Sequence, residues 1–536
     1  MSRRLFFVIF IALLPVFAFG QWQWMQTFGG AGLDNSTGVV AAEGQIFTAG
    51  VFSGQSWIGS NLLSSAGEED VYVAGLDAGG AVSWVLSGGG TLDDEVTAVG
   101  TDAQGNVLVA GAYWLNAAFA GVNFTAQQSS RSLFVLHISP GGELNWAKNL
   151  HGTAIKKISA IGADAYGNVY LSGYFQGQLS LDEWVLTANG ATDLFVTKLD
   201  ASGGVTWAAH AGQSGDTRIT GMAVKPGGGV VVGGYFNGIT QIGDYLFTAN
   251  TYDRDVFLAD YDADGFLQWA RKAGGVHNDE LTGIAIGEGG TVFATGYLVG
   301  VMSLGEGIAI QSANGNPDFY LLKYNSDGLP LQARAMGGAL RDQSMSIVSS
   351  EGTLAITGFF LDAINIDGQQ VINAGPAAGF ILRFDTTLTL LQAEVIRSGE
   401  GPVYPSQIAV DAAGNFLVTG SFEGVLQYGG ATTAGAGGAD AFTGKWKPLS
   451  TATDEPFPAQ AHDLAVYPNP ASGAFQISTA ATLRMVQVFD QQGKMVFTAS
   501  SDQRLIPAQQ WAAGVYRVLV YTTEGRRMET ALIIRN

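Results

Sequence analysis

Aspartates recur at two fixed places in this sequence, and carboxylates at regular spacing can bind cations or cap turns. In the first set, the aspartate follows a glycine by four residues. The first set comprises Asp34, Asp94, Asp216, Asp279 and Asp342, with Lys156 and Tyr404 at the corresponding place in two further segments. In the second set, the aspartate opens an apolar, strand-like run. The second set comprises Asp70, Asp193, Asp255, Asp318 and Asp440, with Ser132 and Ala378 as the exceptions.

Two interpretations of these aspartates follow from their spacing. Strand directions put both sets at the same end of the fold. On one interpretation, each carboxylate accepts backbone N–H bonds in its own turn, which suits a residue repeated in most segments. On the other, the first set forms an acidic ring at a channel mouth and binds a cation, with Ca²⁺ as the candidate, or a cationic ligand. Lys156 and Tyr404 would then make the ring asymmetric. We expect no other cofactor.

Further candidate sites are weaker. Asp260, Asp262, Asp264 and Gly265 match the start of a calcium-binding loop, but Arg271 stands where that loop needs a bidentate glutamate. The histidines have no metal-ligand spacing, and the sequence has neither a nucleophile elbow nor a phosphate-binding loop. Two carboxylates at a channel mouth could also hydrolyse a glycosidic bond if their separation suits it. We therefore expect a binding or structural protein, not an enzyme, with a secreted polysaccharide hydrolase as the alternative.

The elements that would position these residues repeat along the chain. A strand-like run with a central glycine, followed in most cases by an aromatic residue, occurs seven times. The seven glycines are Gly50, Gly111, Gly173, Gly234, Gly296, Gly358 and Gly420. Their spacing is about 61 or 62 residues throughout, which predicts stacked, equivalent units. No run has the 3.6-residue period of a helix.

Each repeat contains four strand-like runs, as in Ile158–Ala163, Val169–Phe175, Leu194–Asp200 and Val205–Ala209. Four antiparallel strands at this spacing predict one blade of a seven-bladed β-propeller over residues 21–446. The seventh repeat lacks a fourth strand, whereas a lone fourth-strand sequence begins near Trp22. We expect this N-terminal strand to complete the last blade and remove a sheet edge.

Composition restricts the class of protein. The chain has 75 glycines and a net charge of −20. It has no cysteine, so disulfides and thiolate sites are excluded. A strongly acidic protein repels phosphate backbones, and we expect no nucleic-acid partner. Residues 1–20 predict a secretory signal: Arg3 and Arg4 precede an apolar segment, and cleavage is expected between Gly20 and Gln21. No later segment predicts a membrane span.

Residues 447–462 are rich in Pro, Ser, Thr and Ala and predict a linker. Residues 463–536 then show about seven short strand-like runs, which predict a small, immunoglobulin-like β-sandwich. Its motifs are Tyr467-Pro468-Asn469-Pro470, a glycine at Gly493, Gly514-Val515-Tyr516, and a final apolar run that ends in Arg535-Asn536. In this order and spacing they resemble the type A C-terminal sorting domain of the type IX secretion system of Bacteroidota.

The resemblance implies translocation by the type IX secretion machinery across the outer membrane, after passage through the periplasm. The product would then be extracellular or attached to the outer cell surface. The repeats resemble those of secreted bacterial β-propeller proteins, where an Asp-x-x-Gly-Asn turn precedes an apolar strand, as at Asp102–Asn106 and Asp411–Asn415. This second resemblance implies fold and location but no particular ligand. A surface glycan or a protein is the expected partner.

Overall fold

The structure is a computed structural model. It describes residues 21–126, 131–366, 369–373, 375–448, 465–467, 474–478, 482–489, 494–499, 504–511, 514–523 and 527–534. The predicted signal segment and residues 449–462 of the predicted linker lie outside the described residues. The chain divides into two compact units, Met1–Leu449 and Ser450–Asn536. Strands and turns make up nearly all of the described residues, with one short 3-10 helix, η1 (Glu288–Gly290), so the protein is all-β, as the sequence predicts.

The first unit consists of four-stranded antiparallel repeats, which we number one to seven in chain order. The first strands are β2 (Asp34–Ala42), β6 (Glu95–Thr101), β12 (Lys156–Ala163), β18 (Thr217–Val224), β24 (Glu280–Ile286), β30 (Asp342–Ser350) and β36 (Val403–Val410). The second strands are β3 (Gln45–Ile58), β7 (Val107–Tyr113), β13 (Val169–Phe175), β19 (Val230–Phe236), β25 (Val292–Leu298), β31 (Thr353–Phe360) and β37 (Phe416–Tyr428).

The outer two strands of each repeat complete the sheet. The third strands are β4 (Asn61–Leu76), β10 (Ser132–Ile138), β16 (Asp193–Leu199), β22 (Asp255–Tyr261), β28 (Asp318–Tyr324), β34 (Ala378–Asp385) and β38 (Ala431–Lys447). The fourth strands are β5 (Val82–Gly90), β11 (Leu144–Gly152), β17 (Val205–Ala211), β23 (Leu267–Ala273), β29 (Pro330–Gly338), β35 (Leu390–Ser398) and, for repeat seven, β1 (Gln21–Gly30).

A short hairpin joins the second and third strands of repeats two to six. These hairpins are β8–β9 (Asn116–Phe119, Val122–Thr125), β14–β15 (Gln178–Leu181, Trp184–Thr187), β20–β21 (Ile239–Ile242, Tyr245–Thr248), β26–β27 (Val301–Gly305, Ile308–Gln311) and β32–β33 (Ala363–Ile366, Gln369–Ile372). In repeats one and seven the long strands β3–β4 and β37–β38 form the same hairpin without a break. Several hairpins also pair with the fourth strand of the preceding repeat, as β14 does with β11, and so link neighbouring sheets.

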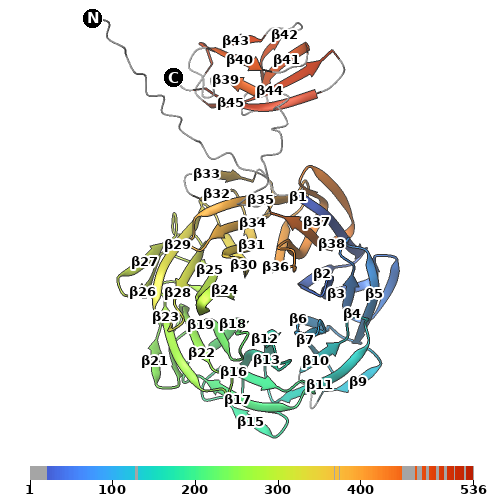
Figure 1. Ribbon diagram of the computed structural model, residues 1–536, viewed down its shortest axis with the longest axis vertical. Coiled ribbons are helices and arrows are strands. Elements are labelled where there is room, and N and C mark those ends of the chain that lie inside the picture. Colours follow the sequence, from blue (N-terminus) through green and yellow to red (C-terminus); the bar gives the residue numbers. More distant parts are fainter. Residues whose placement is uncertain are drawn as a thin grey trace, which may run out of the picture. The chain divides into compact units, whose positions relative to one another are not determined.

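Within the first unit, the repeats follow one another around a common centre, with the first strands innermost (Figure 1). Each first strand contacts the next one, and β2 contacts β36. β1 pairs with β38 from Gln21↔Lys447 to Phe28↔Ala441, so the two ends of the array share one sheet. The pairing buries Phe28 and Trp446.

The repeated glycine is explained by a close approach of two backbones. In every first strand a β-bulge brings a carbonyl group against the glycine of the second strand. A β-carbon at Gly50 would lie 1.9 Å from the carbonyl oxygen of Asn35, and one at Gly173 would lie 1.9 Å from that of Lys157. Only glycine fits at this place, which accounts for its regular spacing.

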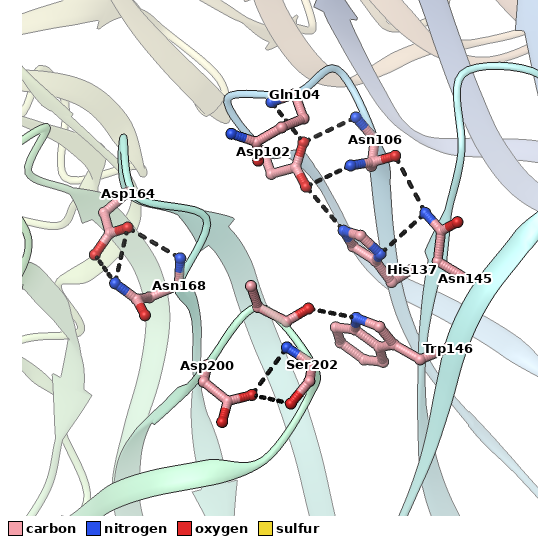
Figure 2. A network of polar contacts seen from close by, with 11 residues as sticks. Asp102, Gln104, Asn106, His137, Asn145, Trp146, Asp164, Asn168, Asp200 and Ser202 are labelled. Atoms are coloured by element: carbon pink, nitrogen blue, oxygen red, sulfur yellow. Dashed lines mark hydrogen bonds and ion pairs between the residues drawn. The ribbon is translucent and has the colours of Figure 1, made fainter.

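A recurring hydrogen bond ties each sheet to its neighbour. The indole Nε1 of Trp146, in β11, donates to the carbonyl of Ala201 in the next repeat at 3.1 Å (Figure 2). Trp84, Trp207 and Trp269 make the equivalent bond. In repeat five, Gln332 replaces the tryptophan and its amide nitrogen donates to Thr387 at 2.8 Å. This tryptophan series therefore joins the repeats.

The second unit contains two antiparallel sheets. One sheet is β39 (Ala465–Tyr467), β40 (Ala474–Ser478) and β43 (Leu505–Pro507), and the other is β42 (Met495–Ala499), β41 (Leu483–Phe489), β44 (Gly514–Thr522) and β45 (Arg527–Ile534). Phe475 and Ile506 of the first sheet share a core with Val486 and Val518 of the second. The strand β43 was not among the runs that the sequence indicates.

Candidate binding site at the central cavity

The two recurring acidic sets lie at the same level of the sheets. Asp34 in β2 and Asp70 in β4 both pair with Phe52, which lies between them in β3. The other repeats have the same three-strand register. Its first-strand positions are Asp34, Asp94, Lys156, Thr217, Asp279, Asp342 and Val403.

Two assignments made from spacing are wrong by one residue. Thr217, not Asp216, pairs with Phe236 of the second strand in repeat four. In repeat seven the equivalent residue is Val403, not Tyr404. The lengths of the connections between repeats differ by a residue, so spacing alone does not fix the register.

The first set does not form an acidic ring at the cavity. Asp34, Asp94, Asp279 and Asp342 are each at most 1% exposed, and they are not among the residues that line the cavity. One carboxylate oxygen of each accepts a backbone hydrogen bond, for example from Gly30 to Asp34 Oδ2 at 2.8 Å. These positions agree with the turn-capping interpretation.

Burial changes the protonation of these aspartates. Desolvation raises the pKa of Asp34 to about 6, of Asp94 and Asp342 to about 7 and of Asp279 to about 8. A second-set carboxylate from the preceding repeat raises each pKa further, as Asp70 does for Asp94. The structure thus brings the two acidic sets together in pairs between repeats.

A cavity of about 580 Å³ lies at the centre of the first unit. All seven first strands contribute to its lining, which is mostly Thr, Ser, Ala, Ile and Met. At one end it is lined by Lys157, Tyr174, Arg218, Tyr235 and Glu280. Lys157, Arg218 and Glu280 each directly follow the first-strand position of the acidic register. Because successive side chains of a strand point to opposite faces, these residues face away from the buried aspartates. Lys157 and Glu280 thus line the cavity directly after Lys156 and Asp279 of the predicted set, whereas Arg218 lies two residues after Asp216.

Arginines and aromatic rings alternate at this end of the cavity. We call Tyr174, Arg218, Tyr235, Arg254, Tyr297, Arg341 and Phe359 the arginine–aromatic arc. The Arg218 guanidinium lies 4.7 Å from the ring centre of Tyr174, and that of Arg254 lies 4.5 Å from Tyr235. Arg341 lies 6.0 Å from Tyr297 and 5.8 Å from Phe359. These distances are those of cation–π contacts.

The arc extends across neighbouring repeats. Burial raises the pKa of Tyr235, while Arg218 and Arg254 on its two sides both lower it. Phe359 packs edge-on against Tyr404, with ring centres 5.1 Å apart, and Tyr404 is 43% exposed. Tyr404, predicted as an exception within the first acidic set, lies outside the acidic register. It contacts Phe359, the last residue of the arc.

Acidic side chains at the same end are paired with arginines. Glu95 lies 3.0 Å from Arg131, Asp216 lies 2.8 Å from Arg218, and Glu280 pairs with Arg254. Lys157 and Arg341 add two cations at this end, whereas Glu68, Glu69 and Asp93 add negative charge close to Glu95. Sequence reasoning missed this arc because its arginines occupy different strand positions.

The segment that resembles a calcium loop is a hairpin turn. Asp262 Oδ1 accepts the N–H groups of Asp264 and Phe266 at 3.0 and 2.9 Å. Asp260 pairs with Lys225, and Gly265 takes a φ of +87°. Within the described residues, no group of three His, Cys, Asp or Glu side chains is placed to hold a metal ion.

The sorting-motif residues are described only in part. Tyr467 ends β39, Gly514 opens β44, and Tyr516 is buried with its ring centre 5.1 Å from that of Trp511. Pro468, Asn469, Pro470, Gly493 and Gly20 lie outside the described residues, and Gln21 opens β1. In the described part of the chain, no helix has the length and apolar character needed to span a bilayer.

Comparison with known proteins finds distant relatives in two organisms. The chain is 23% identical over 445 residues to an uncharacterized WD repeat-containing protein of Acanthamoeba polyphaga mimivirus (68% of this chain, 32% of that protein). It is 25% identical over 346 residues to the regulatory protein FlaEY of Caulobacter vibrioides (57% and 34%). The chain thus spans about a third of the length of the curated relatives it matches.

A solved structure similar to the chain is PorZ, a surface component of the type IX secretion system of Porphyromonas gingivalis. Identity is 12%, with 96% of this chain and 100% of that chain covered, and the TM-score of 0.19 carries no argument about function. Residues 465–535 match the family described as the secretion system C-terminal sorting domain. This domain directs the chain through the type IX secretion machinery to the cell surface or the extracellular space.

Proposed function

We propose that this protein is an exported, seven-bladed β-propeller that binds a carboxylate-bearing oligosaccharide at the arginine–aromatic arc and does not cleave it. Four-stranded antiparallel repeats that contact one another in sequence, with first strands innermost, support the propeller. The pairing of β1 with β38 supports closure of the last blade by the N-terminal strand.

The arc is the observation that carries the binding function. Its guanidinium groups are planar, permanently charged donors that suit carboxylates, and several are held over aromatic rings. Tyr404, which packs against Phe359 at one end of the arc and is 43% exposed, offers apolar surface to the flat face of a sugar. The adjoining cavity of about 580 Å³ has the size of a small-ligand site.

The acidic residues support binding without hydrolysis. A general acid needs a raised pKa and access to the scissile bond. Glu95 and Glu280 near the cavity are ion-paired with arginines, which occupies one carboxylate oxygen of each. Asp94 and Asp279, whose pKa is raised, are buried between repeats.

Binding to matched acidic and neutral oligosaccharides tests the proposal. Isothermal titration calorimetry would compare an oligogalacturonate with a malto-oligosaccharide of equal length. We expect the acidic chain to bind at least about tenfold more tightly, a difference of about 1.4 kcal/mol. Equal affinity, or no binding of either, would contradict the ligand class.

Variants of the arc localise the site. Arg218→Gln combined with Arg254→Gln should weaken binding of the acidic chain by about tenfold or more, because two charge-assisted contacts are lost. Arg271→Gln is the matched control, since Arg271 donates to the carbonyls of Gly328 and Asp327 in a hairpin. Reducing sugar released during the titration would show that the protein is a hydrolase.

A further inference from the structure

Two buried carboxylates face one another across Gly89, at the junction of repeats one and two. A β-carbon built on Gly89 would lie 2.4 Å from Asp70 Oδ1 and 2.6 Å from Asp94 Oδ2. Both aspartates are nearly inaccessible, with 3% and 1% of their surfaces exposed. Asp70 and Asp94 therefore share a small enclosed space that the missing side chain of Gly89 leaves free.

In each carboxylate of this pair, Oδ2 accepts a close backbone hydrogen bond and Oδ1 makes no equally close one. Asp70 Oδ2 accepts the N–H of Ala66 at 2.8 Å, and Asp94 Oδ2 accepts that of Gly90. Asp70 Oδ1 and Asp94 Oδ1 are buried and have no hydrogen-bond partner. A buried carboxylate oxygen without a partner is costly, and a proton or a cation held between the two carboxyl groups would satisfy it.

Two further junctions bring a third-strand carboxylate close enough to a first-strand carboxylate to interact with it. Asp440 of repeat seven raises the pKa of Asp34 in repeat one, and Asp318 does so for Asp342. In all four residues Oδ2 accepts a backbone N–H, while Oδ1 is buried without a partner. A β-carbon on Gly29 would meet Asp440 Oδ1, and one on Gly337 would meet Asp318 Oδ1. We call these three places the acid-pair junctions.

The other junctions carry a cation of their own or lack the pair. Lys272 Nζ lies 2.6 Å from Asp255 Oδ2, beside Asp279. His210 Nδ1 lies 3.3 Å from Asp193, where the first-strand residue is Thr217. At the junction of repeats two and three, both acids are replaced, by Ser132 in the third strand and Lys156 in the first strand. At the junction of repeats six and seven, the two positions hold Ala378 and Val403. First-strand acids thus occur only where the third strand also supplies one.

Lys156 shows that a cation is accepted in this space. Its buried Nζ donates to the carbonyls of Gly152 and Ala154, each at 3.1 Å. Those carbonyls lie four and two residues before the first-strand position. At the junction of repeats one and two, the residues with the same spacing from Asp94 are Gly90 and Leu92. We therefore expect the carbonyl oxygens of these two residues to lie near the carboxylates.

We propose that each acid-pair junction binds one Ca²⁺ ion between neighbouring repeats. Two carboxylates balance the charge of a divalent cation, and oxygen ligands from carboxylates, backbone carbonyls and water are those that Ca²⁺ prefers. Each ion would join a third strand to the first strand of the next repeat, so calcium would stabilise the array independently of any sugar bound at the cavity.

Calcium titration of the purified full-length secreted chain tests this proposal. After dialysis against a chelator, calorimetry should show three bound Ca²⁺ per chain, and the melting temperature should rise on adding Ca²⁺. Asp70→Asn with Asp94→Asn should reduce the stoichiometry to two. The exposed Asp244→Asn is the matched control and should leave it at three. Three sites in the double variant, or two in the control, would contradict the assignment.

A gain of binding gives an independent test. Ser132→Asp with Lys156→Asp installs the acid pair at a junction without one and should raise the stoichiometry to four. If a variant does not fold, the calcium stoichiometry and the melting temperature of the wild-type chain test the proposal by themselves. No calcium uptake by the wild type, together with a melting temperature that depends on pH but not on Ca²⁺, would show that each pair shares a proton instead.

Discussion

The indole Nε1 of Trp24 donates a hydrogen bond to the carbonyl oxygen of Ala78, 3.0 Å away, across the contact between repeat seven and repeat one. Trp24 lies in β1, the strand that pairs with β38, and Ala78 lies in the turn after β4. The bond is the same as those made by Trp84 and Trp146 within the array. The contact between repeat seven and repeat one is therefore built like those that tryptophan makes between the first repeats of the array.

Removing the β1 pairing should destabilise the first unit. Phe28 is buried between β38 and the first repeat, and Phe28→Ala should lower the free energy of unfolding by about 3–5 kcal/mol through the cavity it leaves. Deleting residues 21–28 should lower the melting temperature further, because it exposes the edge of β38. Gln23→Ala, at an exposed site in the same strand, is the control for calorimetric melting. An unchanged melt after the deletion would contradict closure by β1.

The tryptophan bonds between repeats should each contribute modestly. Trp84→Phe removes the 2.8 Å bond to the Pro140 carbonyl and should cost about 1 kcal/mol in urea unfolding, with further loss from reduced packing. Trp57→Phe, at a site that is 52% exposed, should change stability by less than about 0.5 kcal/mol. Equal changes in unfolding free energy for Trp84→Phe and Trp57→Phe would show that the hydrogen bond from Trp84 to Pro140 does not stabilise the fold.

Stability should fall with rising pH when calcium is chelated. Burial raises the pKa of Asp94 to about 7, so the folded state holds a proton that the unfolded chain releases above an ordinary aspartate pKa. The resulting stabilisation is full below the unfolded pKa and is lost as the pH rises through about 7. Asp94→Asn should therefore reduce the loss of unfolding free energy between about pH 5 and pH 8. If, in buffer with a chelator, Asp94→Asn loses as much unfolding free energy over this pH range as the wild type, the raised pKa of Asp94 is contradicted.

Export should depend on the C-terminal unit. Deleting residues 465–536 removes the sorting domain, and the truncated chain should accumulate in the periplasm. Immunoblots of culture medium, cell surface and periplasm would measure the distribution. Restoring the domain from another exported protein of the same host is the control and should recover export. Surface delivery of the truncated chain would contradict the role of this domain.

Regular features of the fold could be predicted from the sequence because each has a local cause. The glycine of the second strand is required where the Asn35 carbonyl approaches Gly50, so its spacing marks every repeat. The β-rich composition and the turn residues indicate many short antiparallel strands, as found. The ordered motifs around Tyr467 and Tyr516 indicate the sorting domain that the family comparison confirms.

The candidate site could not be predicted in the same way. Successive residues of a strand face opposite sides, so an error of one position exchanges buried and cavity-facing residues. One of the two interpretations places Asp94 at the channel mouth, whereas in the structure Asp94 is buried and the next residue, Glu95, pairs with Arg131 near that end. The arc combines Tyr174 of a second strand with Arg218 of the next first strand, which are neighbours only through contacts between repeats.

Covalent mapping of a bound ligand tests the proposed binding site most directly. An oligogalacturonate that carries a photoreactive diazirine would be irradiated with the protein, and labelled peptides would be identified by mass spectrometry. Labels on the peptides that contain Tyr174, Tyr235 and Tyr297, suppressed by excess unlabelled oligogalacturonate, are the predicted result. Competed labels confined to the outer strands, such as those around Trp84 and Trp146, would contradict binding at the arginine–aromatic arc.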